Sequence, residues 1–165
     1  ISNDKRYELI EGELLMTPSP VTRHQRISRR LEFILEKFIT KNNLGELFDA
    51  PYDVYFDNEN VVQPDLLFIS KDSLHIIGEK NVHGAPDLVI EIISENSAYR
   101  DMVQKKKLYA KFGVKEYWVV IPEGEEIEIY TLKDKTFQLY KTYGKDNTLE
   151  SSLLEGLKIG LIDIF

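Results

Sequence analysis

Residues 86–120 read PDLVIEIISENSAYRDMVQKKKLYAKFGVKEYWVV, and this stretch decides the fold. Its first part, 87–93, is apolar on both faces of an extended chain except for its acids, which is typical of a central strand covered by helices. Residues 97–112 carry apolar side chains at helical spacing and end before Gly113, a residue favoured just beyond a helix. A β-like run over 116–121 follows. This order predicts a sheet with helices packed on it.

The rest of the chain extends the same architecture in both directions. Apolar spacing predicts a helix over 22–41, and alternating or β-rich runs separated by turn residues predict the strands. The expected fold class is α+β or α/β with one mixed sheet, an amino-terminal β-hairpin and a carboxy-terminal β-meander. The predicted strands outside the opening stretch are 7–10, 13–16, 46–56, 61–69, 127–129 and 137–139.

Size and composition exclude several classes of protein. The chain has 165 residues, of which 42% are hydrophobic and 30% are charged, so we expect one globular domain over 1–165. With no cysteine, neither disulfides nor a thiolate zinc site can form, and any metal must use oxygen or histidine ligands. No apolar run is long enough to span a membrane, and no signal peptide opens the chain. We therefore expect a cytoplasmic protein with no membrane partner.

Positive charge is concentrated in the two predicted helices, although the net charge of the chain is −7. Residues 22–41 hold six Lys or Arg against two Glu, and residues 97–111 hold five against one Asp, so each stretch carries +4. The remainder must carry −15. The pattern indicates either two solvated helix faces or a surface for a polyanion such as DNA.

Two acids lie on strands that should be buried. Asp65 follows Pro64 at the start of an apolar strand, and Glu91 stands in the middle of the central strand. Each alone could be satisfied by a backbone amide or an arginine. If the two strands are neighbours, however, both carboxylates can converge on one divalent cation, which removes their mutual repulsion. Oxygen ligands favour Mg²⁺ or Mn²⁺.

Asp87 competes with Asp65 for this role, because it also follows a proline and begins an apolar strand. Asp87 and Glu91 are four residues apart, which places them roughly 13 Å apart along one strand. That separation is too large for one shared ion. We therefore assign Asp87 to strand entry or a turn, where aspartate is common.

The second predicted helix supplies a cation near these acids. Asp101, Lys105 and Tyr109 share one face by their four-residue spacing, and Lys105 stands at the boundary of the apolar face. An ion pair with Asp101 is the alternative role for Lys105. We expect Lys106 and Lys107 to be solvated.

Histidine and aromatic residues give weaker signals. His24 opens the first helix and could line a site or serve in capping or packing. His75 and His83 lack the spacing of a helical metal pair. We assign the aromatic residues Trp118, Tyr7 and Tyr109 to the core.

The sequence resembles the Uma2 family over nearly its whole length. The segments that carry the resemblance are YELIEGEL, HQRI, QPDLLFIS, GLKIGLIDIF and, most specifically, the stretch from Pro86 to Val120. The family is placed among restriction-endonuclease-like folds, so the resemblance implies an αβββαβ core. It also implies a PD-(D/E)xK nuclease site, whose signature is an acid after proline, a second acid on the next strand and a lysine two residues later.

In this signature Asp65 matches the first acid and Glu91 the second, but Ile93 stands where the lysine is usual. The resemblance implies that Lys105 on the following helix takes its place, as base or as electrostatic partner. It further implies that Asp65, Glu91 and the main-chain carbonyl of Ile92 ligate Mg²⁺ or Mn²⁺. His24 and Asp101 are secondary candidates for the same site.

Three functions remain open from the sequence. The first is a Mg²⁺-dependent endonuclease that hydrolyses DNA phosphodiester bonds. The second, favoured by Ile93, is an inactive nuclease fold that binds nucleic acid or a protein partner. The third retains the metal but acts on another phosphate substrate, such as a nucleotide. Family analogy and general frequency suggest a two-fold homodimer.

Overall fold

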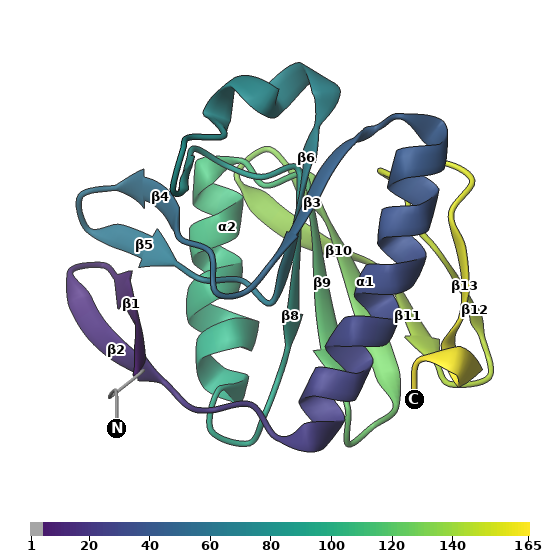
Figure 1. Ribbon diagram of the computed structural model, residues 1–165. Coiled ribbons are helices and arrows are strands. Elements are labelled where there is room, and N and C mark those ends of the chain that lie inside the picture. The colour runs from purple at the N-terminus through teal and green to yellow at the C-terminus, as the bar shows by residue number, and fades with distance from the viewer. Residues whose placement is uncertain (1–4) are drawn as a thin grey trace.

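The computed structural model describes residues 5–165 and is built on a six-stranded mixed sheet with strand order β11-β10-β9-β8-β6-β3 (Figure 1). The strands β8 (Leu88–Ile92) and β9 (Glu116–Ile121) run parallel, and the other neighbouring pairs of this sheet are antiparallel. The chain passes through α1, β3, β6, β8, α2 and β9 in that order, which is the predicted αβββαβ core. The predicted meander continues as β9, β10 and β11.

The bounds of the remaining elements follow in chain order. The helices are α1 (Thr22–Asn42) and α2 (Lys106–Phe112), and α2 continues a π-helical turn over Arg100–Lys105. Short 3-10 helices cover Lys71–Ile76 and Leu161–Asp163. The other strands are β1 (Arg6–Ile10), β2 (Glu13–Thr17), β3 (Gly45–Asp49), β4 (Val54–Asp57), β5 (Asn60–Val62), β6 (Leu66–Ser70), β7 (Val82–His83), β10 (Glu126–Lys133), β11 (Thr136–Gly144), β12 (Thr148–Glu150) and β13 (Lys158–Gly160).

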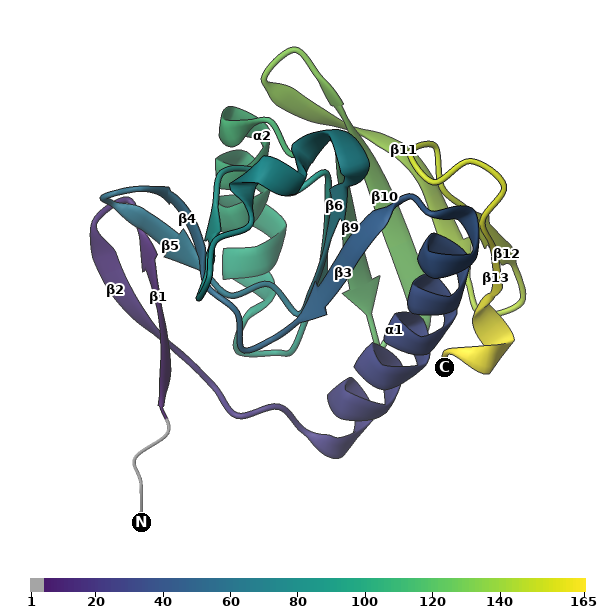
Figure 2. The same cartoon turned by 45° about the horizontal axis from the view of Figure 1, so that its top comes forward.

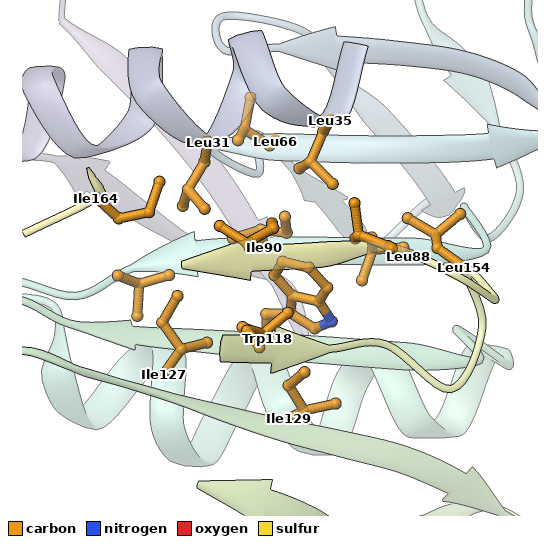
Figure 3. Packing of buried hydrophobic residues seen from close by; sticks show 14 of the residues in the cluster. Leu31, Leu35, Leu66, Leu88, Ile90, Trp118, Ile127, Ile129, Leu154 and Ile164 are labelled. Atoms are coloured by element: carbon orange, nitrogen blue, oxygen red, sulfur yellow. The ribbon is translucent and has the colours of Figure 1, made fainter. Parts of the chain in front are cut away.

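The two faces of the large sheet pack against different layers. Helix α1 and the carboxy-terminal segment cover one face, while α2 and a five-stranded sheet in the order β2-β1-β5-β4-β7 cover the other (Figures 1 and 2). Figure 3 shows Leu31 and Leu35 of α1 over Ile90 and Trp118 of the sheet. The strand β8 is therefore buried on both faces, as its sequence predicts.

Helix α1 forms where the sequence repeats an apolar side chain every four residues. Its buried positions, Ile27, Leu31, Leu35 and Ile39, make one stripe against the sheet. The helix ends at Asn42, and the next residue, Asn43, adopts a left-handed backbone with φ 52° and donates its N–H to the carbonyls of Ile39 and Thr40. Asparagine tolerates this conformation better than most residues, and the helix ends within one residue of the predicted range 22–41.

Two predicted strands are wrong in their extent. The stretches 46–56 and 61–69 each divide into two strands that belong to different sheets, with breaks around Pro51 and Pro64. Proline has no N–H for a β-ladder, so continuous pairing fails at both positions. The second break leaves Asp65 at the point where the chain enters the large sheet.

Two other assignments also need correction. Trp118 is buried as expected, but Tyr7 is 46% exposed, because β1 alternates and directs Glu8 and Ile10 inward instead. Lys106 is half-buried, with its Nζ 3.6 Å from the centre of the Tyr130 ring. Within residues 5–165, no helix has the length and apolarity needed to cross a membrane.

Candidate active site

One cavity of about 500 Å³ contains every residue that the sequence assigned to a site. It opens beside the end of β8, and its wall also includes the segment that joins β2 to α1 and the turn after β9. The six assigned residues come from α1, the start of β6, β8 and the π-helical turn, so only the tertiary fold brings them together. They are His24, Asp65, Glu91, Ile92, Asp101 and Lys105.

Asp65 is held by backbone and side-chain donors at the entry to β6. Leu66 pairs with Ile90 across the antiparallel ladder, so Asp65 faces the position of Glu91 on the next strand. Its Oδ2 accepts the backbone N–H of Ile92 at 2.7 Å and lies 3.2 Å from Nε2 of His24. The expectation that the two acid-bearing strands are neighbours is confirmed.

Glu91 is buried, with only 3% of the residue exposed. Its Oε1 accepts a hydrogen bond of 2.6 Å from the hydroxyl of Tyr109 and forms an ion pair with Lys105. Burial raises the pKa of the Glu91 carboxyl well above its ordinary value. The Lys105 ammonium opposes this rise, but the neighbouring carboxylates, Asp101 and Asp65 among them, add to it.

Lys105 lies at the centre of a buried ionic cluster. It is 2% exposed, and its Nζ lies 2.8 Å from Oε1 of Glu8 and 3.8 Å from Oδ1 of Asp101, besides its contact with Glu91. Burial lowers the pKa of Lys105, but the three carboxylates outweigh burial and raise the pKa well above 10.5. Lys105 is therefore protonated at neutral pH, and this favours an electrostatic role over that of a general base.

The π-helical turn positions the two site residues that the sequence assigned to the second helix. Its wider coil is uncommon and occurs often at functional sites. Asp101 and Lys105 lie within it and contact each other, as their spacing predicted. The hydroxyl of Tyr117 fixes the turn from the sheet by donating to the carbonyl of Asp101 at 2.8 Å. Burial raises the pKa of the Asp101 carboxyl.

Sequence reasoning missed Glu8, Arg100 and the role of Tyr109. Glu8 comes from β1, accepts the backbone N–H of Gln63 at 2.8 Å and lies 3.6 Å from Nη1 of Arg100. The one available signal was alternation, which places Glu8 on the same face of β1 as Ile10. That signal was ambiguous, because Tyr7 and Leu9 make the opposite face equally apolar. Tyr109 is buried as expected, but its hydroxyl serves the site.

Other candidates lie outside the cavity. Asp87 accepts the backbone N–H of Ser70 and pairs with Nζ of Lys115, both at 2.7 Å, which confirms its role at strand entry. His75 and His83 are exposed, and His83 stacks on Tyr55.

Comparison with known proteins supports the resemblance seen in the sequence. The model of the Uma2 family, described as "Putative restriction endonuclease", matches residues 1–162. The chain belongs to this family. A crystal structure titled as a putative nuclease belonging to DUF820, from Anabaena variabilis ATCC 29413, superposes on this Uma2 protein with a TM-score of 0.79. The two are 17% identical, and the superposition covers 96% of this chain and 89% of the other, so they share a fold. No curated protein matches this sequence.

The donors of this Uma2 site suit a hard divalent cation in kind. Within residues 5–165, no three His, Asp or Glu side chains gather as a ready metal cluster. Mg²⁺ nevertheless needs only one or two carboxylates, with waters and substrate oxygens completing its shell. In an antiparallel ladder the N–H and the carbonyl of one residue point to the same side of the strand. The N–H of Ile92 bonds to Asp65 on the β6 side, so the Ile92 carbonyl also faces β6. The residue opposite is Pro64, which has no N–H to donate to this carbonyl. Asp65, Glu91 and this carbonyl together therefore fit Mg²⁺ or Mn²⁺.

Proposed function

We propose that this Uma2 protein is a metal-dependent endonuclease that hydrolyses phosphodiester bonds in DNA. The observation that carries the proposal is the convergence of Asp65, Glu91 and Lys105 from three elements on one cavity. Two carboxylates on neighbouring strands beside a buried cation are the parts that metal-assisted phosphodiester hydrolysis requires. The family description and the nuclease title of the similar structure support the same class of reaction.

In this proposal Asp65, Glu91 and the Ile92 carbonyl hold Mg²⁺ or Mn²⁺. A bound ion of this kind activates water and offsets the charge that develops on the phosphate. The residues of the chain then have separate tasks. Tyr109 and Lys105 fix the orientation of Glu91 by engaging its Oε1, and the backbone N–H of Ile92 fixes Asp65.

Lys105 supplies positive charge at a site where the usual lysine is missing. Ile93 lines the cavity at the usual position, and Lys105 reaches the carboxylates from the helix side instead. Because its ammonium stays protonated, Lys105 stabilises negative charge near the cavity. The imidazole of His24 lies against Asp65 and contributes a further polar group to the cavity wall.

A non-catalytic role is the second candidate, and one observation favours it. Lys105 and Glu91 already satisfy each other, with Glu8, Asp101 and Tyr109 completing the cluster. Such a cluster could serve only to join the two sheets. The protein would then bind nucleic acid or another protein without cutting. The two-fold dimer and the cytoplasmic location remain predictions.

Cleavage assays with isosteric variants separate these candidates. We expect wild-type protein to cut plasmid or single-stranded DNA with Mg²⁺ or Mn²⁺, and Asp65→Asn and Glu91→Gln to lose at least about 100-fold in rate. The exposed Asp146→Asn is the matched control and should cut normally. Calorimetry of Mn²⁺ binding tests the site without a substrate. Equal cutting by all four proteins would indicate a contaminant, and Mn²⁺ binding without cutting would favour the non-catalytic role.

A further inference from the structure

We infer that the cavity receives a single, unpaired strand of nucleic acid and that Tyr99 stacks on a base of this strand at the cavity mouth. The inference rests on the proposed nuclease function and adds the form of the substrate. It follows from the depth of the acids, the balance of charge along the wall and an exposed aromatic residue that lies between two wall residues in the sequence.

The acids lie too deep for a duplex to reach them across the surface. The side chains of Asp65 and Glu91 are 14% and 4% exposed, and both line the cavity. The wall includes residues 17–21, 93–98 and 121–123. A volume of about 500 Å³ is within the range of pockets that enclose one small molecule, and a double helix is far wider than such a pocket. Enzymes whose target must enter a closed pocket, such as those that modify a base, act on single-stranded substrate or extrude the target nucleotide.

Charge alone does not hold a strand here. Three arginines from different elements line the cavity, namely Arg6, Arg23 and Arg100. Together with Lys105 they make four permanent cations. Six carboxylates line the same wall: Glu8, Asp65, Glu91, Glu95, Asp101 and Glu123. Because the acids outnumber the cations by two, and Arg23 and Arg100 already face Glu123 and Glu8, the wall gives little net attraction for a phosphate backbone. Binding energy must then come from the bases.

Tyr99 offers the missing contact with a base. It is 70% exposed, although tyrosine usually buries much of its ring, and it lies between Ala98 and Arg100, which both line the cavity. Val103, 48% exposed, lies one turn further along the same helix. Aromatic side chains next to a cationic groove are the usual platforms for unpaired bases, and stacking on them depends little on sequence.

The cavity wall also has unused hydrogen-bonding capacity. Among the described residues, Oγ1 of Thr17 and Oε1 of Gln63 are buried polar atoms without a partner, and both residues line the cavity. Gln63 donates its Nε2 to Oδ1 of Asp53 at 2.7 Å, so its Oε1 is an acceptor. A base edge that enters the cavity can satisfy such groups, whereas a duplex outside the cavity cannot.

Fluorescence anisotropy with labelled oligonucleotides tests the inference. The probes are a single-stranded oligodeoxynucleotide, the blunt duplex of the same sequence and a mononucleotide as competitor. Each is measured without metal and with Mg²⁺, and a denaturing gel checks that the DNA stays intact. We expect the single strand to bind at least tenfold more tightly than the duplex. Tyr99→Ala should weaken this binding about tenfold, while the control Tyr140→Ala, 50% exposed on β11, should leave it unchanged.

Each outcome decides one question. The inference is overturned if the duplex binds as tightly as the single strand or more tightly, or if the single strand does not bind. It is also overturned if the Tyr99→Ala variant binds normally, or if the mononucleotide binds as tightly as the strand. Selective binding of the single strand that depends on Tyr99, but without any cleavage, would support the inference and contradict the proposed nuclease activity. Cleavage of the duplex and the single strand at equal rates would support the proposed nuclease activity and contradict the inference.

Discussion

Lys105 is held in a protein interior where a lone ammonium would be unstable. Glu8, Glu91 and Asp101 surround it, and Arg100 approaches Glu8 from the other side. The buried cluster thus depends on each member, because removing one charge leaves its partners unpaired in a region of low dielectric. A variant designed to test catalysis at Lys105 therefore also tests folding.

We predict that Lys105→Met lowers the free energy of unfolding by about 3–5 kcal/mol at neutral pH, since three buried carboxylates lose their shared cation. Urea unfolding followed by circular dichroism measures this loss. The unfolding free energy lost in the Glu8→Gln/Lys105→Met double variant should be smaller, by about 1–3 kcal/mol, than the sum of the losses in the two single variants. Strict additivity would contradict a direct coupling between Glu8 and Lys105.

Asp87 gives the clearest pH signature of a single residue. Burial alone would raise the pKa of its carboxyl, but the hydrogen bonds from Lys115 and from the Ser70 N–H outweigh burial and lower the pKa below 3.8. A carboxyl with a lowered folded-state pKa stabilises the fold above its unfolded-state pKa, and this contribution disappears as the pH falls through the folded-state value.

Asp87→Asn should therefore cost about 1–3 kcal/mol of unfolding free energy at pH 7, and the gap to wild type should narrow as the pH falls below about 4. Thermal or urea unfolding over this pH range provides the measurement. A gap that stays constant down to pH 3 would show that the charge of Asp87 makes no contribution.

At the scale of elements, Glu116, the first residue of β9, joins the large sheet to the carboxy-terminal segment. Its buried carboxylate accepts five hydrogen bonds, from the Trp118 indole, the Ser151 hydroxyl, the Ser152 hydroxyl and the backbone N–H groups of Ser152 and Leu153. All of these donors lie in β9 or in residues 151–153. The carboxylate therefore fixes the segment that places Leu154 against the core.

Glu116→Gln replaces one acceptor oxygen with a donor amide and should cost about 3 kcal/mol of unfolding free energy. Hydrogen exchange of the Ser152 and Leu153 amides should accelerate more than exchange in β8, because the loss is local. The control Glu150→Gln removes only an exposed charge 3.8 Å from Lys158, and its effect should stay below about 1 kcal/mol. Equal effects of the two variants would contradict the assigned role of Glu116.

At the scale of the whole molecule, the arginines of α1 are of two kinds. Some make contacts within the fold, and others are exposed to solvent. Arg23 pairs with Glu123 and Glu125, and Arg30 donates to the carbonyl of Ile164 at 3.0 Å. Arg26 and Arg29 are exposed on the same helix. The helix begins at the cavity, so these two side chains are placed to meet phosphates that lie outside it.

The Arg26→Gln/Arg29→Gln variant should bind DNA less steeply against salt, with the slope of log K against log salt smaller by about 2, one for each lost phosphate contact. Titrations at several salt concentrations measure the slope. Lys133→Gln, exposed on β10, is the matched control and should retain the wild-type slope. An unchanged slope in the double variant would remove α1 from the nucleic-acid surface.

The sequence alone predicted the elements and the central part of the site, because both depend on local patterns. Apolar spacing marked α1, the two-sided apolar run marked β8, and the acids at positions 65 and 91 were visible as charges inside apolar strands. The resemblance to the Uma2 family then implied the αβββαβ core, which the strand pairing confirms. Prolines at 51 and 64 also carried the signal for the strand breaks, although two continuous strands were predicted there.

The tertiary structure alone decided which residues surround Lys105. Glu8 is 97 positions away and belongs to a different sheet, and the contact exists only because the fold brings β1 against the π-helical turn and against Gln63. No local periodicity determines how two sheets pack against each other, or which face of a short hairpin turns inward. Those choices depend on apolar burial summed over the whole chain, and they determine the buried charge cluster, the depth of the acids and the shape of the cavity.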